Sequence, residues 1–393
     1  MTESIELVQI PRRSGAVAAA GRFGLAEAER AMAFHAGFPE YAATPLARLN
    51  GLAWDLGLGG LYVKDESFRF GLNAFKVLGG SYAIGSYIAG RLGVELPELP
   101  YEQLVGDRVR SALGTLTFVT ATDGNHGRGV AWTANRLGHR AVVYMPEGSA
   151  AERLSNIRSL GAEASITDLN YDDAVRLANR KAQECGWVMV QDTAWEGYEE
   201  IPARIMQGYT TMALEAWRQL GEKPTHIFLQ AGVGAMAGAV AGFFTSLYGE
   251  DRPVITIVEP KGADCIFRTA RANDGRLHPV AGRLDTMMAG LACGEPCTIA
   301  WDVLRETADN FVSCPDAVAA LGMRTLGRPF SGDPRVISGE SGAVTVGLVT
   351  AVMRDPSLTW LRERLRLDEN ARVLCFSTEG DTDRENYRRI VEE

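Results

Sequence analysis

Short hydrophobic runs alternate with amphipathic stretches through the middle of the chain. Runs rich in β-branched and aromatic residues predict strands at 117–120, 141–144, 163–167 and 187–191. Between these runs the spacing predicts a helix that ends at 137, and further helices over 151–160 and 172–184. Strands and helices in this rhythm form right-handed βαβ units, so we expect a parallel sheet covered by helices on both faces.

The second half of the chain repeats this kind of pattern after a long helix predicted over 202–219. We predict strands at 226–230, 254–259 and 373–376, helices at 235–244 and 343–352, a helical region over 300–330 and a loop at 338–342. These elements predict a second sheet with its own glycine turn. The fold class is therefore α/β, with two domains that each contain a mostly parallel twisted sheet flanked by helices.

The first part of the chain is less regular. We predict one helix near 25–33, a helix face formed by Leu46, Leu49 and Leu52, and a strand at 61–64. A helix is predicted over 75–91, and the polar, proline-containing residues 92–114 indicate a surface insertion.

Parallel sheets bind their ligands beyond the carboxyl ends of their strands. That rule places the turns after Thr120 and Gln191 in one cleft. Each turn begins near a carboxylate, Asp123 in the first and Asp192 in the second.

Lys76 lies in an unusual setting for a lysine. Phe75, Val77 and Leu78 flank it, and no acid lies within residues 71–83. An apolar environment disfavours the ammonium form and lowers the pKa, which supplies the free amine that Schiff-base chemistry requires. The alternative is an ordinary surface lysine at the start of a helix.

The glycine turn at 232–238 is the strongest signal for phosphate binding. Glycines after a strand let the backbone approach an anion, and the N–H groups that open the next helix point at it. The same residues fit a dinucleotide-binding fingerprint, with Glu259 as the ribose-binding acid. Tight packing of helix against sheet is a third explanation.

Composition narrows the class of protein. A chain of 393 residues exceeds the usual size of a single core, and its net charge of −9 argues against a nucleic-acid partner. The sequence shows neither a secretory signal nor an apolar run of membrane-spanning length, so we expect a cytoplasmic protein without a membrane partner. The six cysteines lack the spacing of a zinc site, so we predict no metal site. We expect these cysteines to be buried. A Cys265–Cys293 disulfide is not expected in a reducing compartment.

Four features together match the groups that bind pyridoxal 5'-phosphate: the Lys76 amine, the Gly-Asn-His turn 124–126, the turn 232–236 and the hydroxyl of Thr378. This set resembles fold type II of the pyridoxal-phosphate enzymes, the tryptophan-synthase-like group. T-P-L, V-K-D-E-S, D-G-N-H-G, A-G-V-G-A-M-A-G, M-A-G-L-A-C-G and G-E-S-G-A spread the resemblance over nearly the whole chain. The Lys76 stretch, T-D-G-N-H-G-R-G-V-A-W, N-Y-D-D and Q-D-T-A-W-E-G-Y resemble the diaminopropionate ammonia-lyases in particular.

The resemblance implies a role for each matching residue. Lys76 would bond to the cofactor aldehyde, Asn125 would contact the phenolic oxygen, and Thr378 would face the ring nitrogen. The phosphate would be held by the backbone of Gly232, Val233, Gly234, Ala235 and Met236. A hydroxyl at the ring nitrogen leaves it largely unprotonated, which suits elimination over transamination. The resemblance also implies a large cofactor-binding domain over 1–65 and 206–393, and a small domain over 66–205 that carries Lys76 and the asparagine loop.

Asp123 bears on the choice of substrate. In serine and threonine dehydratases the matching position is small and neutral, and a carboxylate beside a substrate carboxylate costs free energy. Either it holds a second, cationic amino group, or it acts as a base on the face of Cα opposite Lys76. The resemblance implies that Asp123 removes the Cα proton of the D-isomer and that Lys76 removes the Cα proton of the L-isomer. It also implies that Asp192 lies near the β-amine of the substrate. Thr122 and Gly124 would contact the substrate as well. The alternative is a structural role for each carboxylate: Asp123 would cap its own turn, and Asp192 would cap the start of the segment that follows it.

The implied reaction is the α,β-elimination of D- and L-2,3-diaminopropionate to pyruvate and two ammonia molecules, within amino-acid catabolism. Asp192 and Lys76 both remain candidates for protonating the leaving amine. We expect His126 to be a packed, hydrogen-bonded residue, and Tyr171 either to line the cleft or to begin a helix. A homodimer with a small amino-acid substrate is implied by the resemblance. The alternatives are a serine/threonine dehydratase-type lyase of the same fold, or an NAD-dependent oxidoreductase that uses residues 232–237 and Glu259.

Overall fold

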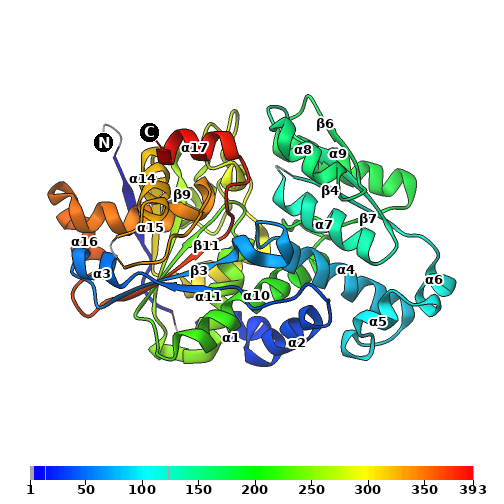
Figure 1. Cartoon of the computed structure of the whole chain (residues 1–393), viewed down its shortest axis with the longest axis horizontal. Helices are drawn as coiled ribbons and strands as arrows, with labels where there is room; N and C mark the ends of the chain where they lie inside the picture. The colour runs from blue at the N-terminus through cyan, green and yellow to red at the C-terminus, as the bar shows by residue number, and fades with distance from the viewer. Residues whose placement is uncertain (1–3, 14, 123, 331, 393) are drawn as a thin grey trace.

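The computed structural model describes residues 4–13, 15–122, 124–330 and 332–392. Two lobes lie side by side, and each is built around its own sheet (Figure 1). Among the described residues, seven strands form the sheet of the larger lobe and four form that of the smaller lobe. Both sheets are flanked by helices, as the sequence predicts.

The larger sheet is parallel through its centre and antiparallel at both edges. Its strands, in spatial order, are β1 (Glu6–Gln9), β10 (Asn310–Cys314), β9 (Val254–Pro260), β8 (His226–Gln230), β11 (Arg372–Ser377), β3 (Gly60–Asp65) and β2 (Leu46–Arg48). Since β11 lies between β8 and β3, the last strand of the chain completes the middle of the sheet.

The smaller sheet is entirely parallel within the described residues. Its strands, in spatial order, are β6 (Glu163–Ile166), β5 (Arg140–Met145), β4 (Thr117–Ala121) and β7 (Val188–Met189). All four predicted strands are present, although β7 is shorter than its prediction. The carboxyl ends of β4 and β7 therefore lie side by side.

Helices connect the strands of both sheets. In the first part of the chain they are α1 (Ala16–Ala20), α2 (Leu25–Ala36), α3 (Asn50–Leu56), α4 (Val77–Leu92), α5 (Tyr101–Leu104), α6 (Asp107–Leu113), α7 (Asn125–Arg136), α8 (Ala151–Arg158) and α9 (Tyr171–Cys185). The later helices are α10 (Glu200–Leu220), α11 (Ala235–Tyr248), α12 (Cys265–Ala272), α13 (Thr298–Thr307), α14 (Asp316–Gly327), α15 (Glu340–Arg354), α16 (Thr359–Leu365) and α17 (Arg384–Glu392).

Strand β8 shows how the core of the larger lobe is divided. Successive side chains of a strand point to opposite faces. Ile227 and Leu229 join the hydrophobic cluster that contains residues of α10, α11 and α13. Phe228 joins the cluster that contains residues of α14 and α15. Both faces of the sheet are therefore buried, as expected for parallel strands.

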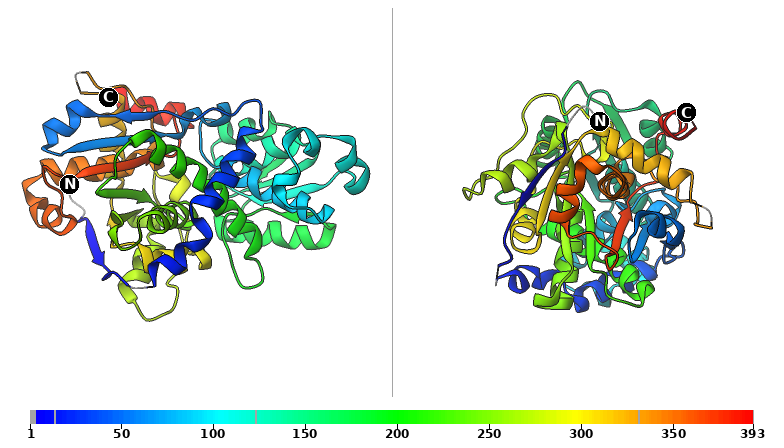
Figure 2. Two further views of the ribbon diagram at one scale, coloured as in Figure 1. Left: turned by 90° about the horizontal axis from the view of Figure 1, so that it is seen from below. Right: turned by 90° about the vertical axis from the view of Figure 1, so that its left-hand side faces the viewer.

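Helices α4 and α10 pack against each other between the two lobes (Figures 1 and 2). Glycines permit this close packing. A Cβ at Gly79 of α4 would lie 2.6 Å from Ile205 Cγ2 and Tyr209 Cε1, and one at Gly208 of α10 would lie 2.4 Å from the Leu78 carbonyl oxygen. Because Lys76 immediately precedes α4, this contact helps to set its position.

Several predicted elements are wrong. Leu46 lies in strand β2, whereas Leu52 lies in helix α3, so the three leucines do not form one helix face. The helical region at 300–330 is interrupted by β10, whereas residues 92–114, predicted as a surface insertion, are mostly exposed or half-buried and contain α5 and α6. Helix α15 begins at Glu340, inside the predicted loop. These elements owe their form to tertiary partners, such as β3 beside β2 and β9 beside β10, which local patterns do not reveal.

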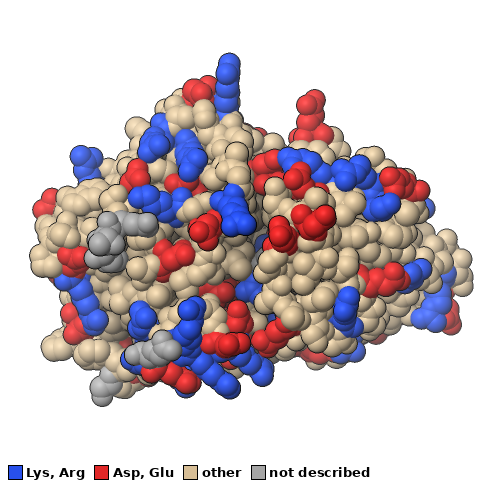
Figure 3. Space-filling view, turned by 90° about the horizontal axis from the view of Figure 1, so that it is seen from above, with Lys and Arg blue, Asp and Glu red and all other residues tan. Residues whose placement is uncertain are grey.

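The domain boundaries predicted at 65/66 and 205/206 stay predictions, and the second falls inside α10. Five of the cysteines are buried and Cys185 is exposed, so the expectation that all six are buried is wrong at one position. None of the helices in the described ranges combines the length and apolarity needed to cross a bilayer. Basic and acidic side chains are interspersed on the face shown in Figure 3, where a furrow runs between the two lobes.

Candidate active site

A pocket between the lobes collects most of the predicted site residues. It encloses about 730 Å³, its open mouth included. The predicted residues that line it are Lys76, Thr122, Asn125, Asp192, Gly232, Val233, Gly234, Ala235, Met236 and Thr378. Gly124 is not among the lining residues, and Asp123 lies outside the described residues. The turns that follow β4 and β7 meet at this pocket, as the sheet topology predicts.

Backbone contacts on two sides fix the segment that carries Lys76. The Phe75 amide donates to the Thr378 carbonyl oxygen at 3.1 Å, which joins the segment to the end of β11. On the other side, a Cβ at Gly129 of α7 would lie 2.7 Å from Val77 Cα. The glycine of the R-G-V-A-W motif therefore lets α7 approach the main chain next to Lys76.

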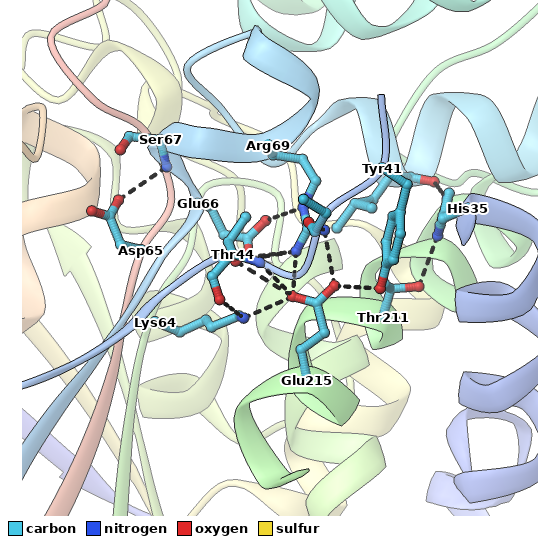
Figure 4. A network of polar contacts seen from close by, with 12 residues as sticks. His35, Tyr41, Thr44, Lys64, Asp65, Glu66, Ser67, Arg69, Thr211 and Glu215 are labelled. Atoms are coloured by element: carbon cyan, nitrogen blue, oxygen red, sulfur yellow. Dashed lines mark hydrogen bonds and ion pairs between the residues drawn. The ribbon is translucent and has the colours of Figure 1, made fainter. Parts of the chain in front are cut away.

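A buried charge cluster precedes this segment. Arg69 donates to both oxygens of Glu66 and both oxygens of Glu215, at 2.7–2.9 Å, and Lys64 also pairs with Glu215 at 2.7 Å (Figure 4). Burial alone would raise the pKa of Glu215, but Arg69 and Lys64 lower it to about 2. The cluster fixes residue 69 to helix α10, seven positions before Lys76.

The main chain between this cluster and Lys76 adopts an uncommon conformation. Phe70, Gly71 and Asn73 have φ of 51°, 69° and 58°. The left-handed region is costly for residues that carry a Cβ. Fixed contacts at both ends of the segment offset that cost: those of Arg69 at one end, and at the other the bond from the Asn73 side chain to Asp381 Oδ1, at 3.1 Å.

The Lys76 ammonium contacts the Asp192 carboxylate. Residues 71–83 contain no acid, and the fold supplies one, Asp192, from a distant part of the sequence. Burial alone would raise the pKa of Asp192, but the Lys76 charge, the nearby His126 and the hydrogen bond from Lys76 hold it well below its ordinary value. Asp192 is therefore a carboxylate facing the amine.

Tyr171 supports the other side of Asp192. Its hydroxyl lies 3.4 Å from Asp192 Oδ1 and accepts from Gln191 Nε2 at 2.9 Å. Tyr171 is also the first residue of α9, which Asn170 caps, so both expectations for Tyr171 hold. The helix that follows β7 begins only at Glu200, so the structure does not support a helix-capping role for Asp192.

His126 is packed and hydrogen-bonded, as predicted. Its Nε2 lies 2.8 Å from the Val190 carbonyl oxygen, and the ring is buried. Burial lowers the pKa of His126, which favours the neutral imidazole. A neutral ring donates from Nε2 to that carbonyl.

The glycine turn connects β8 to α11. Gly234, with φ of 93°, precedes Ala235, where the 14-residue helix α11 begins. A Cβ on Gly232 would lie 3.2 Å from Leu291 Cα and from Cys293 Sγ, so a larger residue there would push on these neighbours. Backbone N–H groups at a helix start form an anion site.

Glu259 does not serve this turn. Its carboxylate accepts from the Ile266 and Phe267 amides at the start of α12. Burial raises the pKa of Glu259, and the side chain of Glu259 is fully buried. The structure therefore does not support Glu259 as a ribose-binding acid.

Gln230 is a residue that the sequence did not reveal. Its Nε2 donates to Thr378 Oγ1 at 2.9 Å and to the Phe376 carbonyl oxygen at 2.8 Å. Its Oε1 is buried without a hydrogen-bond partner among the described residues. Gln230 is the last residue of β8, and a polar residue at the carboxyl end of a predicted parallel strand could have been recognised as a candidate site residue.

Glu379 is the second residue that was missed. It follows Thr378 and lines the pocket, and it accepts a hydrogen bond from Asn125 Nδ2 across the two lobes. Gly124, which precedes Asn125, has φ of 151°, and a Cβ on Gly124 would lie 3.1 Å from Arg153 Cδ. The sequence S-T-E-G-D-T-D contained Glu379 but gave no indication of its partner.

Comparison with known proteins identifies the family of this site. The family model described as "Pyridoxal-phosphate dependent enzyme" matches residues 38–378. A diaminopropionate ammonia-lyase of Salmonella typhimurium is 53% identical over 365 residues, which cover 92% of this chain and 90% of the relative. The chain belongs to the diaminopropionate ammonia-lyase family. The diaminopropionate ammonia-lyase of Escherichia coli K12 is 52% identical over 373 residues, covering 94% and 92% of the two chains.

Solved structures of the Escherichia coli diaminopropionate ammonia-lyase agree with this membership. The holo form matches with a TM-score of 0.91 and 48% identity, covering 99% of this chain and 96% of the other. A complex with an aminoacrylate-PLP azomethine intermediate matches with a TM-score of 0.90 and 48% identity, covering 99% and 97%. The tomato threonine deaminase, at 20% identity and a TM-score of 0.74, shares the fold. Fold type II and pyridoxal phosphate as cofactor are thus confirmed for this diaminopropionate ammonia-lyase family member.

The residues of the pocket fit this cofactor. The Lys76 amine, the glycine turn and the Thr378 hydroxyl all line one space, and a Cβ on Gly232 would crowd Leu291 and Cys293 beside that turn. An amine for the aldehyde and backbone N–H groups for the phosphate are the chemistry that the cofactor requires.

Proposed function

We propose that this chain catalyses the α,β-elimination of ammonia from D- and L-2,3-diaminopropionate; the released aminoacrylate then takes up one water to give pyruvate and a second ammonia molecule. The contact between Lys76 and Asp192 inside the pocket is the observation that carries the proposal. This substrate differs from serine by a β-ammonium in place of a hydroxyl. A buried carboxylate favours such a cation at close range, whereas it gives a neutral hydroxyl no comparable advantage.

In the proposed mechanism, Lys76 and the carboxylates move protons at named atoms of the substrate. Pyridoxal phosphate supplies a sink for the electron pair left at Cα when its proton is removed. Lys76 would hold the cofactor through its amine, and that amine would remove the Cα proton of the L-isomer. Asp123 removes the Cα proton of the D-isomer from the opposite face. Asp192 faces the β-nitrogen and keeps it protonated, because an amine leaves poorly unless it is protonated.

The remaining pocket residues hold the cofactor and the substrate in this proposal. Asn125 donates to the phenolic oxygen, the backbone of residues 232–236 holds the phosphate, and Thr378 donates to the ring nitrogen. Thr122 and Gly124 contact the substrate beside Asp123. Support comes from the position of nearly all these residues around one pocket.

We further propose a cytoplasmic homodimer that acts in amino-acid catabolism and has no nucleic-acid partner. The family resemblance supports the dimer and the pathway, and the net charge of −9 supports the absence of a nucleic-acid partner. Light scattering coupled to size-exclusion chromatography tests the dimer, and cell fractionation tests the location.

The proposed function is tested by adding 2,3-diaminopropionate to the purified holoenzyme while the visible spectrum and pyruvate release are recorded. We expect a shift of the visible band and pyruvate from both isomers. Asp123→Asn should lose the D-isomer selectively. Asp192→Asn should lower activity with both isomers, whereas Asp173→Asn, which changes a half-exposed carboxylate on α9 that pairs with Arg176, should not.

Activity with L-serine or L-threonine and none with 2,3-diaminopropionate would contradict the proposal. That outcome would favour the dehydratase alternative, for which a curated L-threonine ammonia-lyase from Geobacter sulfurreducens is 27% identical over 56% of this chain.

A further inference from the structure

We propose that Glu379 is a positioning residue, which orients the amide of Asn125 toward the cofactor and fastens it to the larger lobe. The inference deepens the proposed function, because it rests on the assignment of Asn125 to the cofactor's phenolic oxygen. No sequence motif assigns a role to Glu379.

Contacts with the larger lobe hold Glu379 in place. Its carbonyl oxygen accepts from the Gly339 amide at 3.0 Å, and its Oε1 accepts from the Ser341 amide at 3.2 Å. A Cβ on Gly339 would lie 3.1 Å from Glu379 Cγ, so the side chain packs tightly against the start of α15. Glu379 is only 1% exposed, and this buried position leaves its carboxylate little freedom to move.

The other carboxylate oxygen, Oε2, which also accepts from Thr382 Oγ1 at 3.4 Å, reaches across to the smaller lobe. Glu379 Oε2 accepts from Nδ2 of Asn125, the first residue of α7. A second polar contact runs in parallel, from Arg153 Nη2 of α8 to Glu340 Oε1 at 3.2 Å. The orientation of the Asn125 amide is therefore coupled to the relative position of the two lobes.

The chemistry of the pair decides which end of the amide faces Glu379. An asparagine side chain has an NH₂ group with two hydrogens and a carbonyl oxygen that only accepts. Both carboxylate oxygens of Glu379 accept hydrogen bonds, Oε1 from the Ser341 amide and Oε2 from Asn125 Nδ2, so the NH₂ end of the Asn125 amide faces Glu379. One hydrogen of Asn125 is then bound to Glu379, and the second remains available to an acceptor in the pocket. A phenolic oxygen is such an acceptor.

Loss of the carboxylate would release this selection. In Glu379→Gln, the new amide cannot accept from both Asn125 and the Ser341 amide, because one of its two ends carries only donors. The amide of Asn125 could then rotate and present its carbonyl oxygen to the phenolic oxygen. Two acceptors facing each other weaken binding of the cofactor.

The test is a double-mutant cycle on cofactor affinity. Apo-protein of the parent, Glu379→Gln, Asn125→Ala and the double variant is titrated with pyridoxal phosphate, with protein fluorescence and the visible absorption maximum as readouts. We expect each single variant to weaken binding about tenfold or more, as for a hydrogen bond to a charged group. If Glu379 acts through Asn125, the double variant binds no more weakly than Asn125→Ala.

Asp383→Asn is the matched control. It changes a carboxylate in the same loop that accepts from the Asn386 amide at 3.0 Å, and we expect its affinity to stay within about twofold of the parent. Circular dichroism checks folding; if Glu379→Gln does not fold, Glu379→Asp, which keeps the charge but shortens its reach, takes its place in the cycle.

Two results would overturn the inference. One is an unchanged affinity and spectrum in Glu379→Gln; the other is a loss that multiplies fully with that of Asn125→Ala. If Asn125→Ala itself binds the cofactor like the parent, the role of Asn125 and the inference fail together. Pyruvate release from 2,3-diaminopropionate by the parent is measured separately, so the proposed reaction is judged independently.

Discussion

Gln230 Nε2 donates a hydrogen bond to Thr378 Oγ1 at 2.9 Å, from one strand of the larger sheet to the end of its neighbour. A hydroxyl that accepts from an amide still has its own hydrogen to donate. The bond therefore leaves the Thr378 hydroxyl as a donor. In the proposed site, where Thr378 faces the cofactor's ring nitrogen, this donor favours the unprotonated ring that elimination uses.

Replacing Gln230 should therefore weaken catalysis without removing the cofactor. In Gln230→Leu the Thr378 hydroxyl loses its fixed donor and can rotate, so we expect kcat to fall about tenfold, the value of one hydrogen bond. Steady-state pyruvate release measures kcat. Thr378→Ser keeps the hydroxyl and should stay close to the parent, whereas equal losses in the two variants would contradict this role for Gln230.

Two glycines of helix α4 should respond in opposite directions to the same change. Gly79→Ala places a methyl group 2.6 Å from Ile205 and Tyr209, and we expect a loss of about 1–3 kcal/mol in the free energy of unfolding. Gly90→Ala meets no atom within 4 Å and should stabilise the protein by about 0.5–1 kcal/mol. Urea unfolding of both variants makes the comparison. Equal effects would show that the α4–α10 contact is not tight.

Breaking the buried charge cluster should be costly. Arg69→Met leaves Glu66 and Glu215 buried without their main partner, and we expect a loss of about 3–5 kcal/mol in the free energy of unfolding. The exposed pair between Arg140 and Glu163 provides the control, because Arg140→Met should cost less than about 1 kcal/mol. Denaturant unfolding at neutral pH separates the two.

Glu340 should make the protein less stable as the pH rises. Burial and the nearby Glu379 raise the pKa of Glu340 to about 8, more than Arg153 lowers it. In the unfolded chain this carboxyl group titrates near pH 4.3, so between about pH 4.3 and 8 the folded state holds one more proton. The free energy of unfolding then falls with rising pH, by up to about 1.4 kcal/mol per unit from this group.

The corresponding measurement uses Glu340→Gln. The variant keeps an acceptor for Arg153 but cannot titrate, so its free energy of unfolding should change less between pH 5 and pH 8 than that of the parent. Denaturant unfolding at pH 5, 6, 7 and 8 supplies the curves. Parallel curves for the two proteins would show that Glu340 does not titrate in this range.

Periodic parts of the sequence predicted their structure well. The alternation over 116–191 and the glycine turn at 232–238 identified the smaller sheet, the β8–α11 turn and the cleft, because their signals are local. At Leu46 the local pattern predicted the wrong element. A leucine spaced three residues from the next one fits a helix, but pairing with β3 makes residues 46–48 a strand.

The candidate site divides in the same way. Lys76, Asn125 and Thr378 were found because they lie in recognisable motifs, and the structure places all three around one pocket. Gln230 and Glu379 were missed because their roles depend on partners 148 and 254 residues away in sequence. The ion pair of Lys76 with Asp192 escaped notice for the same reason.

The strand order of the larger sheet has a consequence for how the protein is made. The smaller sheet is complete once residue 189 has been synthesised, whereas β3 must wait for β11, at residues 372–377, before it gains its parallel neighbour. Contacts between such distant segments form late. We therefore expect the smaller lobe to fold while the ribosome is still extending the chain, and Thr378 to complete the pocket only near the end of translation.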